Sequence, residues 1–188
     1  MQLGIDIDAY TYPGQDIPSA AAADMAYVTS LHANSVMISF PFFAAGPSTI
    51  TARKSTPTPA ALGEIVTAAQ RAHLFVSVRP LLDESSLGKS RVVWTPPDLR
   101  AWFASYRKFL LPYAAMAQRL HVPEFAVGAE LSQFETAPRW NGLDRALGRV
   151  YHGKLMFALN WNVAMRGAHG GGRTAVDTVD AYAPRQET

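Results

Sequence analysis

The chain has 188 residues, of which 48% are hydrophobic and 17% are charged, with 17 basic against 15 acidic side chains. These values fit a single packed domain over residues 1–188 and exclude disorder driven by charge. No cysteine is present, which excludes disulfides, thiolate nucleophiles and cysteine-ligated metals. No apolar run approaches the roughly 18 residues of a membrane span, and basic residues gather no further than pairs such as Arg53-Lys54. We therefore expect a soluble chain without a nucleic-acid partner, either cytoplasmic or secreted after removal of a signal.

Apolar and β-branched segments alternate along the chain with segments of helical periodicity. We predict strands at residues 3–8, 35–40, 74–78, 124–127, 154–160 and 175–182. Four helices are predicted between the first five strands, at 19–32, from 58 onward, from 95 to beyond 113, and at 138–151. Thr58 and Thr95 each precede proline, as expected of a helix start, and Pro112 is expected to kink the third helix. Residues 41–58 are predicted to form a loop.

Strict alternation of strands and helices predicts parallel strands joined by right-handed crossovers, in an open doubly wound sheet or a (β/α)8 barrel. The sequence contains no G-x-G-x-x-G, P-loop or G-x-S-x-G motif, which disfavours a nucleotide-binding sheet and serine hydrolase chemistry. Polar residues gather where strands pass into loops: Asp6, Asp8, Arg79, Asp83, Glu84, Glu130, Asn160, Asn162 and Asp180. This layout predicts an α/β TIM barrel with its site at the C-terminal ends of the strands. Because such a barrel usually needs roughly 250 residues, we expect only its first six βα units here.

Glu130 is the most informative polar residue, because it directly follows the apolar strand that ends in Gly128-Ala129. A carboxyl group at a barrel mouth can be partly buried and serve as a general acid. The alternative is a surface glutamate that begins a loop. Glu135, five residues further on, is expected to be a solvated charge.

Asp6 and Asp8 share one face of the first strand, because side chains alternate along a strand. A buried carboxylate needs a partner, and Arg79 at the end of the third strand is the expected one. We favour structural support over direct chemistry for this group. A metal site would need histidines at neighbouring strand ends, whereas the five histidines fall at helix ends or in a loop: His32, His73, His121, His152 and His169. We therefore expect neither a metal nor another cofactor.

Aromatic residues mark several loops of the predicted barrel. Phe42 follows the second strand, Trp94 precedes the third helix, and Trp161 and Tyr182 follow the fifth and sixth strands. Aromatic rings beside amides and carboxylates suit sugars, which offer apolar faces and hydroxyl edges. The alternative is core filling, which is expected for the helix residues Trp102 and Trp140. The candidate substrate-binding residues are Asp8, Phe42, Arg79, Trp94, Asn160, Trp161 and Tyr182.

Several segments together resemble glycoside hydrolase family 113. They are Asn34-Ser35-Val36-Met37-Ile38 before Phe40-Pro41-Phe42, Arg79-Pro80-Leu81-Leu82-Asp83, Trp102…Tyr106…Tyr113-Ala114, Val127-Gly128-Ala129-Glu130-Leu131, Trp140, and Ala158-Leu159-Asn160-Trp161. The resemblance runs from the second strand to the sixth. It implies a (β/α)8 barrel of the clan of retaining glycosidases, whose known members include β-mannanases, and a carbohydrate substrate. By this resemblance Glu130 is the acid/base, Asn160 and Trp161 contact the substrate, and Tyr182 is a site residue.

The same resemblance implies a double displacement, in which a second glutamate attacks the sugar about 5–5.5 Å from the acid/base. In the family this nucleophile ends the seventh strand, which we expect to lie beyond this sequence, and Glu187 is not assigned the role. Ala129 stands where the clan usually has an asparagine that contacts the sugar 2-hydroxyl. This departure favours the alternative of a non-catalytic carbohydrate-binding or scaffold barrel. A metal-dependent hydrolase is disfavoured by the histidine positions, and an oligomer is possible because an open barrel leaves strand edges to pair.

Overall fold

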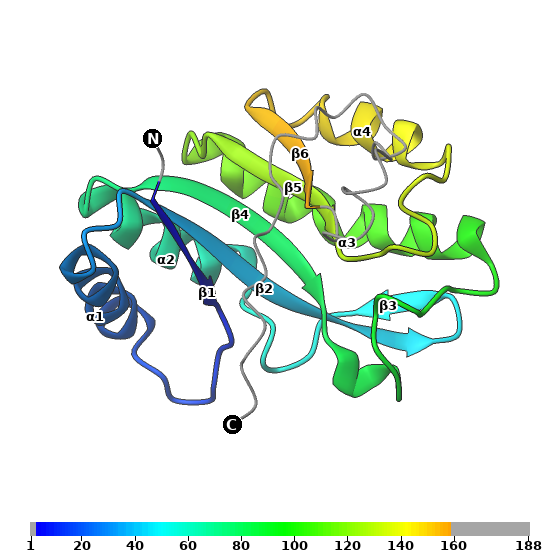
Figure 1. The fold of residues 1–188 in the computed structure, drawn as a ribbon, viewed down its shortest axis with the longest axis horizontal. Coiled ribbons are helices and arrows are strands. Elements are labelled where there is room, and N and C mark those ends of the chain that lie inside the picture. Colours follow the sequence, from blue (N-terminus) through cyan, green and yellow to red (C-terminus); the bar gives the residue numbers. More distant parts are fainter. Residues whose placement is uncertain (1–2, 159–188) are drawn as a thin grey trace.

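The computed structural model describes residues 3–158, which form one curved sheet with helices along one of its faces (Figure 1). Its parallel strands lie in the order β1 (Gly4–Asp8), β2 (Ser35–Gly46), β4 (Phe75–Leu82), β5 (Glu124–Ala129) and β6 (Lys154–Ala158). Sequential strands are neighbours throughout this order, as in a (β/α) barrel. The predicted alternation of parallel strands and helices is therefore confirmed for this part of the chain. The predicted strand at 175–182 lies outside the described residues.

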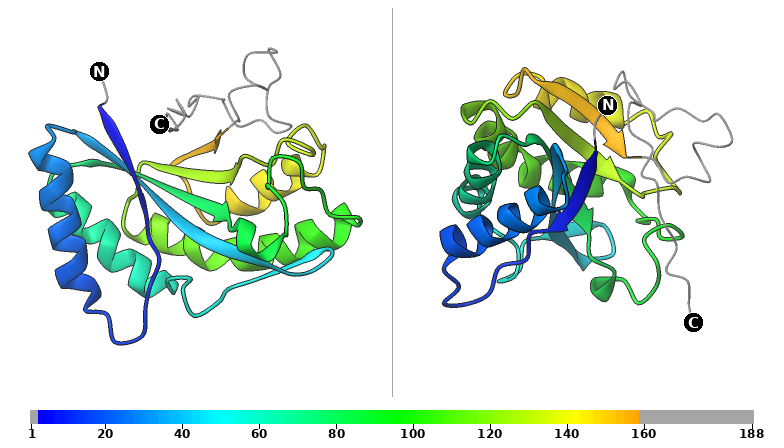
Figure 2. Two further views of the ribbon diagram at one scale, coloured as in Figure 1. Left: turned by 60° about the horizontal axis from the view of Figure 1, so that its bottom comes forward. Right: turned by 60° about the vertical axis from the view of Figure 1, so that its left-hand side comes forward.

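Four helices, α1 (Ile17–Ser30), α2 (Pro59–Arg71), α3 (Leu99–Arg119) and α4 (Trp140–Leu147), cover the same face of the sheet (Figure 2). Thr58 caps α2 as predicted, because its side chain accepts a hydrogen bond of 3.2 Å from the Ala61 backbone N–H. The predicted start of the third helix at Thr95 is wrong. Pro96 and Pro97 disfavour a helical conformation in the residues that precede each of them, so the helix begins at Leu99. It is capped by Asp98, whose side chain accepts a hydrogen bond of 3.0 Å from the Ala101 backbone N–H. The helix continues through Pro112 to Arg119.

Strand β2 is longer than predicted and continues through Pro41 to Gly46. The following residues turn back as β3 (Thr49–Thr51), which pairs antiparallel with the end of β2. The backbone N–H of Ile50 in β3 donates to the hydroxyl of Ser105 in α3 at 3.0 Å, which anchors this hairpin. The predicted loop is confirmed for residues 52–58 but is wrong for residues 41–51, which form the hairpin, because proline normally interrupts a ladder and Pro41 does not.

Three histidines end helices in the same way. His32, His73 and His121 follow α1, α2 and α3 with φ values of 58°, 58° and 52°, the left-handed conformation common just after a helix. After α2 the Leu74 N–H donates to the Ala69 carbonyl at 3.1 Å, and after α3 the Val122 N–H donates to the Ala117 carbonyl at 2.9 Å. These bonds close the last helical turn before the chain enters the next strand. The predicted placement of these histidines at helix ends is confirmed.

An aromatic cluster fills the space between the sheet and helices α3 and α4. The rings of Trp102 and Tyr106 stack with centroids 4.5 Å apart, and the Trp140 ring meets Phe157 of β6 edge-on at 4.8 Å. Further members are Phe40, Phe42, Phe103, Phe109, Tyr113 and Phe134. Burial of these large rings supplies much of the stability of this layer.

The opposite face of the sheet, which would face the axis of a closed barrel, is polar. Asp6 and Asp8 lie on this face of β1, as predicted, while Ile5 and Ile7 pack against the core. Lower on the same face the Ser77 hydroxyl donates to Glu124 at 2.8 Å, and Lys154 forms an ion pair with Glu124 at 3.0 Å. Within residues 3–158, no helix is both long and apolar enough to cross a bilayer.

Candidate active site

Arg79, Asp6 and Ser39 form a polar group across three adjacent strands. The Arg79 guanidinium pairs with the Asp6 carboxylate, and its Nε donates to the Ser39 hydroxyl at 2.9 Å. The Ser39 hydroxyl donates in turn to Asp6 at 2.7 Å. Arg79 is only 5% exposed, so these partners compensate for the loss of its hydration. The predicted pairing of Arg79 with a β1 aspartate is confirmed, and its engagement with both neighbours supports a structural role.

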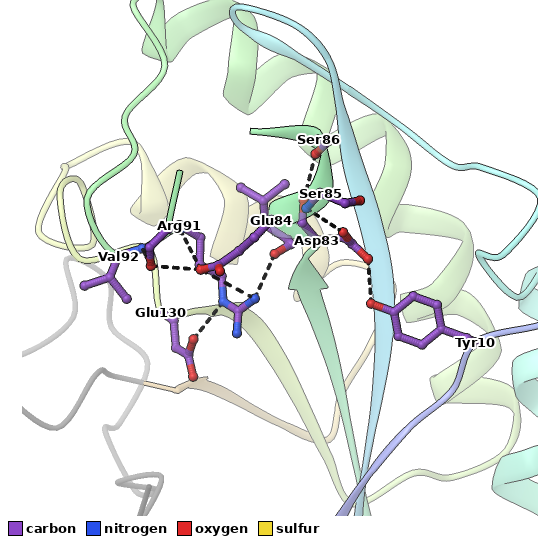
Figure 3. Close-up of polar contacts among 10 residues, drawn as sticks. Tyr10, Asp83, Glu84, Ser85, Ser86, Arg91, Val92 and Glu130 are labelled. Carbon is purple, nitrogen blue, oxygen red and sulfur yellow. Dashed lines mark hydrogen bonds and ion pairs between the residues drawn. The ribbon is translucent and has the colours of Figure 1, made fainter. Parts of the chain in front are cut away.

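A second polar group lies above the first, where β1 and β4 end. The Tyr10 hydroxyl donates to Asp83 at 2.6 Å (Figure 3). Burial and the Asp83 carboxylate raise the pKa of Tyr10 well above its usual range, with a smaller contribution from Asp8 and an opposing one from Arg91. Burial alone would raise the pKa of Asp83, but hydrogen bonds from Ser85 and Tyr10 lower it. At neutral pH this group therefore consists of an ionised Asp83 and a protonated Tyr10.

Glu130 stands at the end of β5 and points toward Arg91 from the loop before α3 (Figure 3). Its Oε2 lies 2.7 Å from Arg91 Nε, and its side chain is 21% exposed. Arg91 is held in place because its Nη1 donates to the Leu82 carbonyl at 3.1 Å and its backbone N–H donates to Glu84 at 2.8 Å. Glu130 is thus a partly buried carboxylate at the mouth, as predicted, with a fixed cationic partner.

The backbone around Gly128 explains how Glu130 leaves the strand. The pairing of β5 with β6 shifts register between Ala126 and Ala129, and Glu130 has φ 54°. A Cβ atom on Gly128 would lie 2.8 Å from the Trp140 ring, so only glycine lets this tryptophan pack directly on the strand. The Glu130 N–H donates to the Ala158 carbonyl at 3.1 Å, which ties the turn to β6.

Glu135 is not the solvated charge that we predicted. It is 1% exposed, and neither carboxyl oxygen has a hydrogen-bond partner among residues 3–158. Burial raises its pKa to about 7. The loop folds inward because neighbouring Phe134 stacks on Trp140 and its carbonyl accepts a 2.8 Å hydrogen bond from the Trp140 indole. The apolar residues Leu131 and Phe134 were the signal in the sequence that could have revealed this burial.

The other predicted substrate-binding residues have different positions. Asp8 is exposed at the end of β1, and Trp94 is 8% exposed with its ring edge against Phe134 at 6.2 Å. Assigning Phe42 to the site was wrong: it is 1% exposed, and its ring lies 5.0 Å from that of Tyr106 in the core. The reason is that β2 extends past Pro41, so Phe42 is a strand residue facing the helices. Asn160, Trp161 and Tyr182 lie outside the described residues.

The structure also adds two residues that the sequence did not single out, Tyr10 and Arg91. Tyr10 follows β1 by two residues, a position that could have indicated it. Arg91 lies in a polar loop with no periodic pattern, and only the fold brings it to Glu130. No cluster of three or more histidine, cysteine, aspartate or glutamate residues suited to a metal ion occurs within the described part of the chain.

Parallel strands, outer helices and carboxylates at the strand ends define part of a (β/α)8 barrel. Solved structures support this fold. The β-mannanase AaManA of family 113 from Alicyclobacillus acidocaldarius, in complex with ManMIm, is 20% identical with a TM-score of 0.72, and the match covers 85% of this chain and 55% of that one. A complex of a family 113 β-1,4-mannanase is 17% identical with the same TM-score of 0.72, covering 87% of this chain and 57% of that one.

The model of Glycoside Hydrolase Family 113 matches residues 11–183, and the chain therefore belongs to this family. The resemblance inferred from the sequence is thus confirmed. A β-mannanase from Streptomyces thermolilacinus is more distant, at 14% identity and a TM-score of 0.51, and the match covers 88% of this chain and 52% of that one. A search of curated protein sequences found no match. The chain spans little more than half the length of the two family 113 structures, 57% and 55%.

Proposed function

We propose that this chain contributes the acid/base half of the active site of a retaining glycosidase that acts on β-linked mannan or mannooligosaccharides. The observation that carries the proposal is Glu130, a partly buried carboxylate at the carboxyl end of β5 in a member of family 113. The carboxyl ends of the strands are where (β/α)8 enzymes hold their catalytic groups. The solved family 113 structures named above are described as β-mannanases, which supports the substrate class.

In the proposed mechanism, Glu130 protonates the glycosidic oxygen while a second glutamate attacks the anomeric carbon. Glu130 then removes a proton from the water that releases the sugar. We expect the second glutamate to end the seventh strand of the barrel, outside residues 1–188, and Glu187 is not assigned this role. The two carboxyl groups would stand about 5–5.5 Å apart in the assembled site.

Arg91 has a positioning role in this proposal. Its guanidinium donates to the Leu82 carbonyl and its backbone N–H donates to Glu84, and the guanidinium in turn holds the Glu130 carboxylate at the strand end. A carboxyl group that is already oriented loses little freedom when the glycosidic oxygen arrives.

The substrate would be bound around this carboxylate. Asp8 is exposed at the end of β1, and Tyr10 and Asp83 present a hydrogen-bonded pair nearby on the same rim. Asn160, Trp161 and Tyr182 are proposed as further contacts on family resemblance. Trp94 is largely buried and would offer a sugar little surface, and Arg79 would support Asp6 instead of touching the sugar.

The test compares Glu130→Gln with the matched control Glu64→Gln, an exposed glutamate on α2. Both variants are made in the protein as it occurs naturally, whose length is checked by intact mass. Release of reducing sugar from β-mannan should fall by at least about 100-fold in Glu130→Gln, because a general acid contributes this much or more, with sugar binding retained. The control should keep normal turnover. Full activity in Glu130→Gln would show that Glu130 is not the acid/base.

A non-catalytic carbohydrate-binding barrel is the second candidate. The observation in its favour is Ala129, a buried methyl group that precedes Glu130 and has no polar atom to offer a sugar hydroxyl. This candidate expects saturable binding of mannooligosaccharides by the unmodified protein with no release of reducing sugar. Binding would then be the same in Glu130→Gln and in the control.

A further inference from the structure

A groove on the outer wall of the molecule is rich in arginine. It lies between α3 and α4, with a volume of about 370 Å³, and four of its lining residues are Arg100, Arg107, Arg139 and Arg145. In the sequence these residues are scattered over 46 positions (100 to 145) and do not form a basic run. Only the packing of α3 beside α4 gathers them around one hollow.

The charges of this groove are not balanced within the described part of the chain. No acidic residue lines the groove, and none of its four arginines forms an ion pair within residues 3–158. Other guanidinium groups of the molecule do pair with carboxylates, as Arg79 and Arg91 show. Gathering four positive charges costs repulsive energy, which a bound anion would offset.

The shape of the groove suits a small ligand. Buried Phe103 and Leu143 form an apolar floor, and exposed arginines surround it. Its volume lies near the lower end of small-molecule sites, which are usually about 300–1,000 Å³. Guanidinium groups are planar forks that hold the oxygens of phosphate and sulfate by paired hydrogen bonds.

The groove is separate from the candidate active site. Phe103, at the floor of the groove, belongs to the aromatic cluster between the sheet and α3, and neither Glu130 nor Arg91 lines the groove. Loss of anion binding in the groove therefore need not affect turnover at Glu130. This separation allows the two to be tested independently.

We propose that the groove between α3 and α4 binds a small multivalent oxyanion, a ligand that carries two or more phosphate or sulfate groups. A single phosphate or sulfate group cannot balance the charge of four guanidinium groups, so we expect the ligand to carry more than one. Two sources share this chemistry, namely free polyphosphate and a sugar that carries phosphate or sulfate esters. The carbohydrate proposed for the active site is neutral, so this ligand is a different molecule from the substrate.

The test titrates the protein with two probes, inorganic tripolyphosphate and fructose 1,6-bisphosphate, at an ionic strength held constant with chloride. Arg107→Gln/Arg145→Gln removes two charges from the groove, and Arg71→Gln/Arg119→Gln removes two from other helix surfaces. We expect saturable binding that the groove variant weakens at least about tenfold, since a charged hydrogen bond is worth about 1.5–3 kcal/mol, and that the control variant leaves unchanged. Tighter binding of tripolyphosphate would indicate free polyphosphate, and tighter binding of the bisphosphate a sugar ester.

Other results would overturn the proposal. Equal weakening in both double variants would mean that net charge alone attracts the probes. Absence of saturable binding for both probes would mean that the arginines are simply hydrated. A single-stranded RNA oligomer that binds the groove more tightly than either probe, with loss in the groove variant, would replace the small ligand by a nucleic-acid backbone.

Discussion

The two faces of the sheet differ in the kind of side chain that they bury. On the helical face aromatic rings pack together, and their few polar atoms are mostly satisfied by backbone groups, as when the Tyr106 hydroxyl donates to the Val127 carbonyl at 3.1 Å. On the face toward the barrel axis, charged groups are kept and paired, as in Arg79 with Asp6. The helical face thus provides stability, whereas the axial face keeps charged groups in place below the candidate site. Two large buried side chains depart from this pattern, Trp102 on the helical face and Glu135 in the loop after β5, because their buried polar atoms have no partner among the described residues.

The largest effect is expected for Trp102, which is 0% exposed within the aromatic cluster. Trp102→Ala should lower the free energy of unfolding by about 3–5 kcal/mol, because it leaves a large cavity. The control is Trp102→Phe, which keeps an aromatic ring and removes the unpartnered indole N–H. We expect this variant to cost much less, as measured by urea unfolding. A similar cost for both would mean that the indole N–H contributes to stability.

Glu135→Gln should make the stability of the protein less dependent on pH. In the folded protein the pKa of Glu135 is about 7 against an ordinary 4.5, so the folded state holds its proton where the unfolded chain releases it. Stability therefore falls as pH rises from 4.5 to 7 and stays lower above this range. Glu135→Gln removes this loss and should be more stable than the unmodified protein at pH 8 by up to about 3 kcal/mol. At pH 4 the two proteins should be nearly equal.

The matched control for this experiment is Glu64→Gln on the surface of α2, unfolded in urea at pH 4, 6 and 8. Its unfolding free energy should follow that of the unmodified protein at every pH. A stabilisation of Glu135→Gln that is the same at pH 4 and pH 8 would show that Glu135 does not titrate in this range. It would then contribute by packing alone.

The smallest effect is expected on the axial face. Ser39→Ala removes the hydroxyl that links Arg79 to Asp6, but the direct ion pair remains. We expect a loss of about 1 kcal/mol in unfolding free energy, the ordinary value of a hydrogen bond. The control is Ser30→Ala at the exposed end of α1. A loss of several kcal/mol in Ser39→Ala alone would mean that the arginine pair collapses without the hydroxyl.

The sequence was sufficient to predict the order of strands and helices, because apolar periodicity and caps such as Thr58 are local signals. It also predicted that Glu130 lies at a strand end and that Arg79 pairs with a β1 aspartate. It missed the ion pair of Glu130 with Arg91, because a polar loop carries no pattern that fixes its path. It placed Glu135 in solvent and Phe42 in the site, since burial of one residue in an irregular segment depends on how distant elements pack. The arginine groove was missed for the same reason.

The left-handed histidines after α1, α2 and α3 have a consequence for how this barrel can vary. One backbone geometry returns the chain to the sheet three times at the amino-terminal rim. At the opposite rim the connections differ, from a hairpin after β2 to a long arginine-bearing loop after β4. The shared turn at this rim fixes where each of the following strands begins. The connections at the other rim can then change length and chemistry without moving the strands that they join.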